Sequence, residues 1–169
     1  MRIRGLHGLH RSVNLFLINH VFVGTRFFGV KRRLLNGIGN AIGEGTRVVG
    51  PIFCSAKLIV GKNCWIGRQF AAEGNGTVTI GDNCDIAPQV TVLTGGHAIG
   101  DATRRAGEGQ SYAAAIGSGT WVGARATIVG DVVVGNSCVV AACACVTKNV
   151  GDNVLIGGVP AKVIKELDT

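Results

Sequence analysis

The sequence predicts an all-β fold, a parallel β-helix of six-residue repeats, and three observations support this. Aliphatic residues recur every six positions along most of the chain. The chain holds 27 Gly and only 3 Pro among its 169 residues. Hydrophobic residues make up 47% of it, which excludes a disordered chain. A period of six fits neither a single strand nor an α-helix, but it does fit short strands joined by tight turns.

The repeat is an aliphatic residue followed by Gly or another small residue. It runs through Ile42, Val48, Val60, Ile66, Ile80, Ile86, Val92, Ile116, Val122, Ile128, Val134, Val140 and Val146. Three repeats would form one triangular coil with the aliphatic side chains inside, and coils would stack about 4.8 Å apart. Where Gly follows the aliphatic residue, it is expected to tolerate unusual backbone angles at a corner.

Two interruptions mark where the coils carry insertions. Ile66 and Ile80 are 14 positions apart, which indicates two extra residues near Gly74–Thr77. Val92 and Ile116 are 24 positions apart, four whole repeats, so a loop interrupts the coil without loss of phase. We therefore expect a basic, partly helical segment over residues 1–40 and a β-helix over 41–160 with a loop at 95–115. A C-terminal tail or short helix is expected over 161–169.

The net charge of +7 comes from the N-terminal segment, because residues 1–36 contain seven basic residues and no acid. A basic helix with apolar residues either packs on the repeats, which we favour, or binds anionic lipid. No nucleic-acid motif accompanies the charge, so nucleic acid is not an expected partner. The apolar stretch at 13–23 is too short to span a bilayer, which takes about 20 residues. It lacks the features of a signal peptide. We expect a cytoplasmic protein, with peripheral contact at the inner membrane face as the alternative.

The six cysteines fit free thiols better than disulfides. Cys64, Cys84 and Cys138 occupy one repeat position, four residues after an aliphatic residue, where a small buried side chain is expected. Cys143 and Cys145 lack the two-residue spacer of redox and zinc motifs. Buried thiols are typical of a reducing compartment.

The end of the repeat region strongly resembles a known family. Residues 146–150 (VTKNV) and 157–164 (GGVPAKVI) are similar to the C-terminal signature of the maltose, galactoside and polysaccharide O-acetyltransferases, which are hexapeptide-repeat acyltransferases. The resemblance covers residues 80–167 closely and 42–72 more loosely. It implies a left-handed β-helix, a homotrimer with active sites between subunits, and acetyl-CoA as the acyl donor without a required metal.

His97 is the candidate catalytic base. It lies where a repeat strand breaks into the long loop, whereas His7, His10 and His20 lie in the basic segment. Transfer of an acetyl group to a hydroxyl needs a base with a pKa near neutral. The resemblance implies this role for His97, with direct transfer from acetyl-CoA to a hydroxyl of a sugar or cell-surface polysaccharide precursor. A backbone N–H is the expected oxyanion donor.

Acceptor and donor residues are suggested more loosely by the resemblance. Glu73 falls where an acceptor-contacting residue of the family lies, and Asp85 and Asp101 are alternatives to it. Arg104 and Arg105 in the long loop could bind a phosphate or carboxylate, or be solvated. The resemblance implies a CoA site made of Trp121, Ala124, Ala142, Thr147, Lys148, Lys162 and Lys165. Ala124 and Ala142 are 18 positions apart, one full coil, so they are expected to stack.

Other functions remain open. Serine acetyltransferases share the signature but carry a large helical N-terminal domain, and about 40 residues precede the repeats here. Transfer to an amino sugar is chemically adjacent. A zinc-dependent β-helix of the carbonic-anhydrase kind needs three His ligands, and only His97 lies in the coils. A non-catalytic scaffold is the third alternative.

Overall fold

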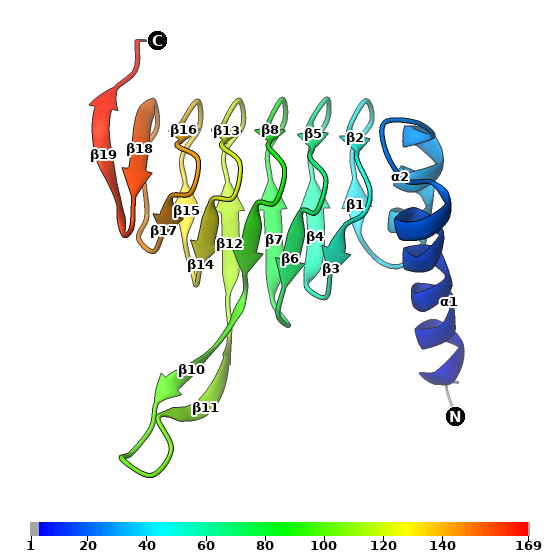
Figure 1. Cartoon of the computed structure of the whole chain (residues 1–169), viewed down its shortest axis with the longest axis horizontal. Helices are drawn as coiled ribbons and strands as arrows, with labels where there is room; N and C mark the ends of the chain where they lie inside the picture. Colours follow the sequence, from blue (N-terminus) through cyan, green and yellow to red (C-terminus); the bar gives the residue numbers. More distant parts are fainter. Residues whose placement is uncertain (1–3, 169) are drawn as a thin grey trace.

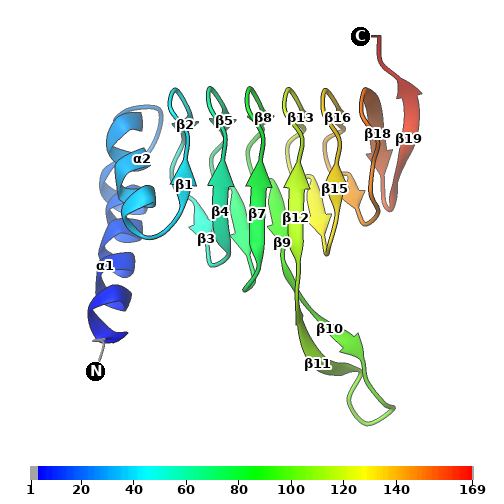
Figure 2. The ribbon, with the colours of Figure 1, turned by 180° about the vertical axis from the view of Figure 1, so that it is seen from behind.

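A computed structural model describes residues 4–168, so residues 1–3 of the basic segment and residue 169 of the tail lie outside the described chain. The chain forms the expected parallel β-helix, a row of stacked triangular coils (Figures 1 and 2). Each side of the triangle is one sheet, and we call the three sheets faces 1, 2 and 3. Equivalent strands of successive coils pair in parallel, as Ile42 with Val60 and Val60 with Ile80 on face 1.

The strands are short and recur in the same order in each coil. Face 1 contains β1 (Ala41–Ile42), β4 (Lys57–Val60), β7 (Thr77–Ile80), β12 (Ala113–Ile116) and β15 (Val133–Val134). Face 2 contains β2 (Arg47–Val48), β5 (Trp65–Ile66), β8 (Asp85–Ile86), β13 (Trp121–Val122), β16 (Val139–Val140), β18 (Val154–Gly158) and β19 (Ala161–Glu166). Face 3 contains β3 (Phe53–Cys54), β6 (Ala71–Glu73), β9 (Thr91–Leu93), β14 (Thr127–Val129) and β17 (Cys145–Val146).

The aliphatic repeat fills the inside of the prism, which confirms the predicted phase. All thirteen aliphatic positions of the repeat are buried, and Ile86, Val92, Val122 and Ile128 are 0% exposed. Cys64, Cys84 and Cys138 are also buried at their shared repeat position. Each alternate residue points outward, so two-residue strands suffice to sort side chains between core and surface.

The expected reason for the repeated Gly is wrong. Gly61, Gly81 and Gly117 do not have a positive φ; instead, a Cβ on Gly117 would lie 2.5 Å from the carbonyl carbon of Gly135 in the next coil. These glycines are needed because successive backbones approach too closely for a side chain. The left-handed corner is two residues further on, at positions such as Asn63, Asn83 and Asn153, with φ of 55°, 56° and 55°.

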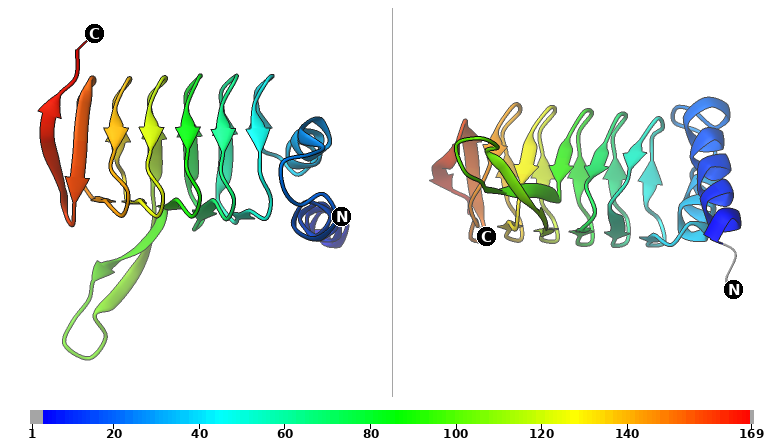
Figure 3. Two further views of the ribbon diagram at one scale, coloured as in Figure 1. Left: turned by 45° about the horizontal axis from the view of Figure 1, so that its top comes forward. Right: turned by 90° about the horizontal axis from the view of Figure 1, so that it is seen from below.

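Helices cover the N-terminal end of the β-helix: α1 (Arg4–Phe16), a π-helical turn η1 (Leu17–Val21) and α2 (Phe28–Gly37) (Figure 3). Ile18 and Leu35 are buried under the first coil. Asn19 satisfies the backbone of that coil, because Nδ2 donates to the Ile52 carbonyl at 2.8 Å and Oδ1 accepts from the Ile52 N–H at 2.9 Å. An uncovered sheet edge would expose such groups for pairing with another chain. No helix of the described residues is long and apolar enough to cross a membrane.

The C-terminal segment is not the tail or short helix that the sequence suggested. Ala161–Glu166 form strand β19, which pairs antiparallel with β18 and closes the other end of face 2. The last parallel pair of face 2 joins β16 to β18, as Val140 with Ile156. A returning strand supplies hydrogen bonds to an edge that has no further coil to pair with.

The loop expected at 95–115 is a two-stranded arm. β10 (Gly95–Ile99) and β11 (Ala106–Ser111) pair antiparallel and project from the lower edge of the prism in Figure 1. The chain leaves the coil after β9 and re-enters it at β12. Thr79 and Ile80 of β7 pair with Ala115 and Ile116 of β12, so the coils stack without a gap beside the arm.

Candidate active site

His97 lies on the first strand of the arm, opposite Gly109 on the second. Its imidazole is exposed, and Nδ1 lies 3.0 Å from the backbone oxygen of Gly107. A carbonyl oxygen only accepts hydrogen bonds, so Nδ1 must carry the proton and donate it. In the neutral ring, Nε2 is then the nitrogen with the free lone pair. The arm therefore presents an oriented imidazole whose outer nitrogen can accept a proton.

A shallow hollow surrounds this histidine. It is lined by Asn75, Gly95, Gly96, His97, Gly109 and Gln110. Asn75 comes from the insertion in the preceding coil, whereas the other residues belong to the arm. Small residues on both strands leave the imidazole accessible, and polar groups of Asn75 and Gln110 lie at the hollow's wall.

The base of the arm is held by Thr94, a residue that belongs to no recognised motif. Thr94 is fully buried, and its Oγ1 donates to the Glu73 carbonyl at 2.9 Å and accepts from the Gly76 N–H at 3.2 Å. Its carbonyl accepts from the Tyr112 N–H at 2.8 Å, which ties the start of the arm to its end. The one signal in the sequence is that Thr94 is the last residue before the repeat breaks.

Tyr112 completes this base. Its hydroxyl donates to Gln110 Oε1 at 2.6 Å, and its ring packs on Gly96, where a Cβ would come within 2.9 Å of the ring. Gly76 is equally constrained, since a Cβ there would clash with the Tyr112 carbonyl. The arm is thus a rigid extension of the coils at its root, which fixes where His97 is presented.

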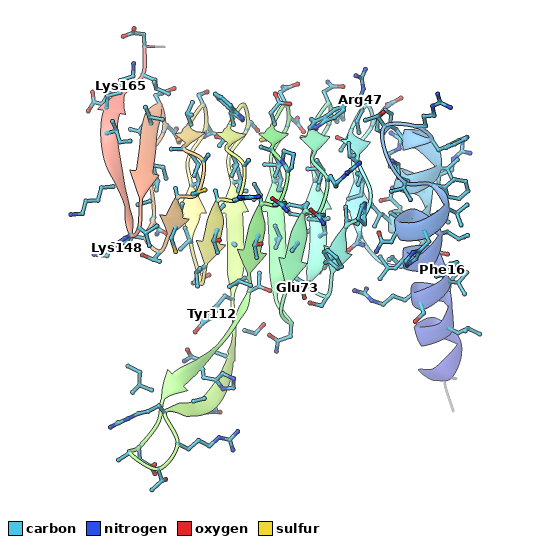
Figure 4. The ribbon with its side chains drawn as sticks, in the orientation of Figure 1. Phe16, Arg47, Glu73, Tyr112, Lys148 and Lys165 are labelled. Atoms are coloured by element: carbon cyan, nitrogen blue, oxygen red, sulfur yellow. The ribbon has the colours of Figure 1, made fainter. Side chains whose placement is uncertain are left out.

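Glu73 lies at this root, on β6 beside Leu93 of β9, and Figure 4 shows it near Tyr112 at the lower edge of the prism. Its carboxylate accepts a hydrogen bond from the Ser55 hydroxyl at 2.7 Å, and the same hydroxyl accepts from the Gly74 N–H at 2.9 Å. The carboxylate is half-buried and keeps further acceptor capacity. It is not the partner of His97 Nδ1, which lies against the Gly107 carbonyl.

Asp101 acts within the tip of the arm. It accepts hydrogen bonds from the Thr103 hydroxyl and N–H and from the Arg104 N–H, and these bonds hold the pKa of its carboxyl below the usual value. This is a turn-capping role, the ordinary use of an Asp at such a site. Arg104 and Arg105 are exposed at the same tip, and Arg105 Nη1 donates weakly to the Gly100 carbonyl at 3.4 Å.

The predicted donor residues lie on the outer surface of the C-terminal coils. Trp121 is on β13, 55% exposed. Ala124 and Ala142 follow β13 and β16, whose residues pair one coil apart, and the Ala124 carbonyl accepts from the Cys143 N–H at 2.9 Å. Thr147, Lys148, Lys162 and Lys165 are exposed on the last coils. In Figure 4, Lys148 and Lys165 lie at opposite edges of these coils, so one chain does not gather them at one point.

Asp85 lies with the predicted donor residue Trp121 and not with His97 and Glu73. It lies on β8, paired with Trp121 of β13 and Trp65 of β5 on face 2. Figure 1 places these strands at the edge of the prism opposite the arm. Within one chain, the structure therefore leaves two separate groups, with Glu73 at the arm's root and His97 on the arm in one, and Asp85 and Trp121 on face 2 in the other.

Comparison with known proteins identifies the family. Residues 113–148 match the family described as bacterial transferase hexapeptide (six repeats). A galactoside O-acetyltransferase of Escherichia coli K12 is 36% identical over 144 residues, which cover 82% of this chain and 69% of that relative. The chain belongs to the hexapeptide-repeat acetyltransferases. It is therefore an acyltransferase, as the C-terminal signature predicted.

Solved structures of hexapeptide-repeat acetyltransferases have the same fold. A galactoside acetyltransferase in complex with coenzyme A superimposes with a TM-score of 0.83 at 29% identity, covering 99% of this chain and 84% of that one. An acetyltransferase of Vibrio cholerae complexed with acetyl coenzyme A gives the same TM-score, 0.83, at 22% identity, covering 97% and 88%, and supports the fold alone. Among residues 4–168, no group of three or more His, Cys, Asp or Glu side chains could hold a metal ion.

Proposed function

We propose that this chain transfers an acetyl group from acetyl-CoA to a hydroxyl of a sugar, with His97 as the general base. The observation that carries the proposal is the hydrogen bond from His97 Nδ1 to the Gly107 carbonyl, 3.0 Å long, which makes Nε2 of this exposed side chain the lone-pair nitrogen of the neutral ring. The relatives named galactoside O-acetyltransferase support a sugar acceptor and acetyl transfer. An acceptor in a cell-surface polysaccharide remains a prediction.

The reaction needs two proton transfers, and His97 Nε2 takes part in both. Nε2 takes the proton of the acceptor hydroxyl as its oxygen attacks the thioester carbonyl carbon. When the C–S bond breaks, the imidazolium returns that proton to the departing CoA thiolate. The products are the acetyl ester and free CoA, and His97 ends in its starting state. The carbonyl of Gly107 stabilises the transient imidazolium, because it accepts the hydrogen bond from Nδ1–H throughout.

We infer that the complete site is shared between copies of the chain. The arm with His97 and the wall with Trp121, Ala124 and Ala142 lie at different edges of one prism (Figures 1 and 3). A rotation-related neighbour would bring the arm of one copy over the wall of the next, and a closed ring of such contacts is the usual form of a symmetric oligomer. A homotrimer of three parallel prisms fits the triangular coil.

Replacement of His97 by Ala tests the chemistry. Loss of one general base costs about 10²–10⁴-fold in rate, and we expect a fall of that size in CoA release measured with a thiol reagent. Binding of CoA, followed by calorimetry, should persist because the donor wall is untouched. His20 is the matched control, since it is exposed and stacked on Phe16 at 4.7 Å, away from the arm. If His97→Ala retains the rate of the wild type, His97 is not the base.

Peripheral membrane contact stays a prediction, as does a cytoplasmic location. Three apolar side chains of α1 are exposed on one helical stripe, Leu9 at 66%, Val13 at 46% and Phe16 at 58%. Such a stripe beside basic residues favours an anionic lipid surface. Co-sedimentation with anionic and neutral vesicles, compared for the wild type and a triple Ser variant of this stripe, would test it; equal sedimentation of both proteins would argue against lipid contact.

A further inference from the structure

Face 2 carries a row of outward side chains, and the acetyl transfer proposed above uses only one of them, Trp121. Arg47, Trp65, Asp85 and Trp121 occupy the same outward position of β2, β5, β8 and β13, and we call these four residues the tryptophan row. They are in register, since Arg47 pairs with Trp65, Trp65 with Asp85, and Asp85 with Trp121. With strands about 4.8 Å apart, the strands of the two tryptophans are about 10 Å apart.

The row is open to solvent in the chain. Trp121 is 55% exposed, Arg47 and Asp85 are exposed, and Trp65 is half-buried. Phe28 of α2 packs edge-on against Trp65 with the ring centroids 6.0 Å apart, so this ring is held in place on one side. Trp65 also borders a hollow lined by Gly45, Arg47, Asn63, Cys64 and Asp85. Figure 4 shows Arg47 at the upper edge of the prism, at the end of the row near the helices.

We propose that the tryptophan row binds an extended glycan and that the acceptor is an oligosaccharide or polysaccharide chain. An indole ring packs well on the C–H face of a pyranose, and the side chains of Asp85 and Arg47 can hydrogen-bond its hydroxyls as acceptor and donor. The spacing of about 10 Å between the strands of Trp65 and Trp121 is close to the length of a disaccharide unit. A protein partner suits the row less well, because Asp85 between the two rings would be desolvated without a cation.

The direction of the row fits the proposed transfer, on which this inference rests. The donor wall runs from Trp121 toward the C-terminal coils, through Ala124 and Ala142 to the lysines. The tryptophan row runs from Trp121 toward the N-terminal coils. Trp121 is therefore the point where the two paths meet, and a glycan lying along the row would present one sugar unit beside the thioester. Val139, the next residue of the same ladder after Trp121, is aliphatic, so the sugar-binding chemistry stops there.

Intrinsic fluorescence tests this directly, because the chain has only 2 Trp residues and both are in the row. The wild-type protein, without CoA, is titrated with galactose, maltose and sialic acid and with their oligomers of increasing length. We expect at least one series in which the oligomer changes the emission and binds about tenfold more tightly than its shortest member, about 1.4 kcal/mol. Trp65→Ala should reduce that difference to about twofold or less. If Trp65→Ala fails to fold, Asp85→Asn is titrated with the same series in its place.

Phe53→Ala is the matched control, since Phe53 is an outward aromatic residue, 50% exposed, on face 3. It should keep the chain-length preference of the wild type. Three results would overturn the proposal: no oligomer of the panel alters the emission, oligomers and their shortest members bind equally, or acrylamide fails to quench either Trp in the purified protein. The last result would make the row a subunit contact. None of these readouts needs turnover, so they are separate from a failure of the acetyl transfer itself.

Discussion

Gly117→Ala tests the close stacking of coils. The added Cβ would lie 2.5 Å from the Gly135 carbonyl carbon and 2.6 Å from both the Gly135 oxygen and the Asn136 nitrogen. Carbon atoms prefer about 3.5 Å, so the two coils must separate locally by about 1 Å. All three neighbours are backbone atoms, and no side-chain rotation can relieve the contact. The shift would stretch the hydrogen bonds of the same ladder, Gly117 N–H to Val134 O at 2.8 Å and Gly135 N–H to Val150 O at 3.0 Å.

The cost can be estimated from these contacts. Overpacking costs about 1–3 kcal/mol, and each weakened backbone hydrogen bond adds up to about 1 kcal/mol. Replacing Gly by Ala returns about 0.4–1 kcal/mol by restricting the unfolded chain. The net loss is about 2–3 kcal/mol, which corresponds to a fall in Tm of about 4–12 °C for a chain of this size.

Gly151 is the matched control, because it occupies the same repeat position in the last coil and a Cβ there meets nothing within 4 Å. Gly151→Ala should therefore leave stability unchanged or raise it by up to about 1 kcal/mol. Thermal melting followed by circular dichroism, with urea unfolding as a second measurement, compares the two variants. If both variants melt at the temperature of the wild type, or both fall equally, close coil stacking is not what selects Gly at this position.

Two further predictions concern a buried cation and the free thiols. Lys31 is fully buried with Nζ 2.6 Å from the Gly24 carbonyl, and burial lowers its pKa, so the unfolded chain holds this proton more tightly than the folded one. The free energy of unfolding should therefore rise with pH between the lowered pKa of Lys31 in the folded state and the unfolded value of about 10.4. Lys31→Met should remove that rise when urea unfolding is measured from pH 7 to 10. If the variant keeps the same dependence of stability on pH, the prediction is contradicted. Cys143 is exposed, whereas Cys54, Cys64, Cys84 and Cys138 are buried, so a thiol reagent should modify Cys143 first. Cys143→Ser should abolish the fastest phase of thiol modification. A fast phase that survives this substitution would point to Cys145.

The six-residue period predicted the core because burial itself produces it. Each aliphatic position, from Ile42 to Val146, faces the inside of the prism in every coil, so the sequence and the packing share one period. The arm had no such signal. Its second strand, Ala106–Ser111, has no buried residue, and a strand without a hydrophobic face leaves no alternation to detect. Only the preserved phase across the interruption showed that it was an insertion.

Features that depend on backbone contacts could not be predicted from the sequence, for a different reason. The partner of His97 is the carbonyl of Gly107, and a carbonyl is present at every residue, so no residue type marks it. Gly117 is likewise required by the short distance between two backbones. In the sequence, the regular spacing of Gly in the repeat is explained equally well by a turn. Strand β19 was missed because its pairing with β18 depends on an end of the β-helix that only the assembled coils create. Glu73, by contrast, was a candidate by resemblance, and the structure adds that it lies at the root of the arm, where Ser55 holds its carboxylate.

The separation of the two groups of site residues has a consequence for how variants behave. The aliphatic core is buried within one chain, and both ends of the prism are covered by the chain's own helices and by β19. Stability of the coils therefore does not depend on the arm, whose side chains lie outside the core. On the proposed shared site, catalysis depends on both the arm and a neighbouring chain's wall. Substitutions on the arm or the wall should then lower activity at constant melting temperature, and mixing two inactive variants, one in His97 and one in Trp121, should restore part of it. Restoration occurs only if a copy with an intact arm meets a copy with an intact wall, so a site contained within one chain predicts none.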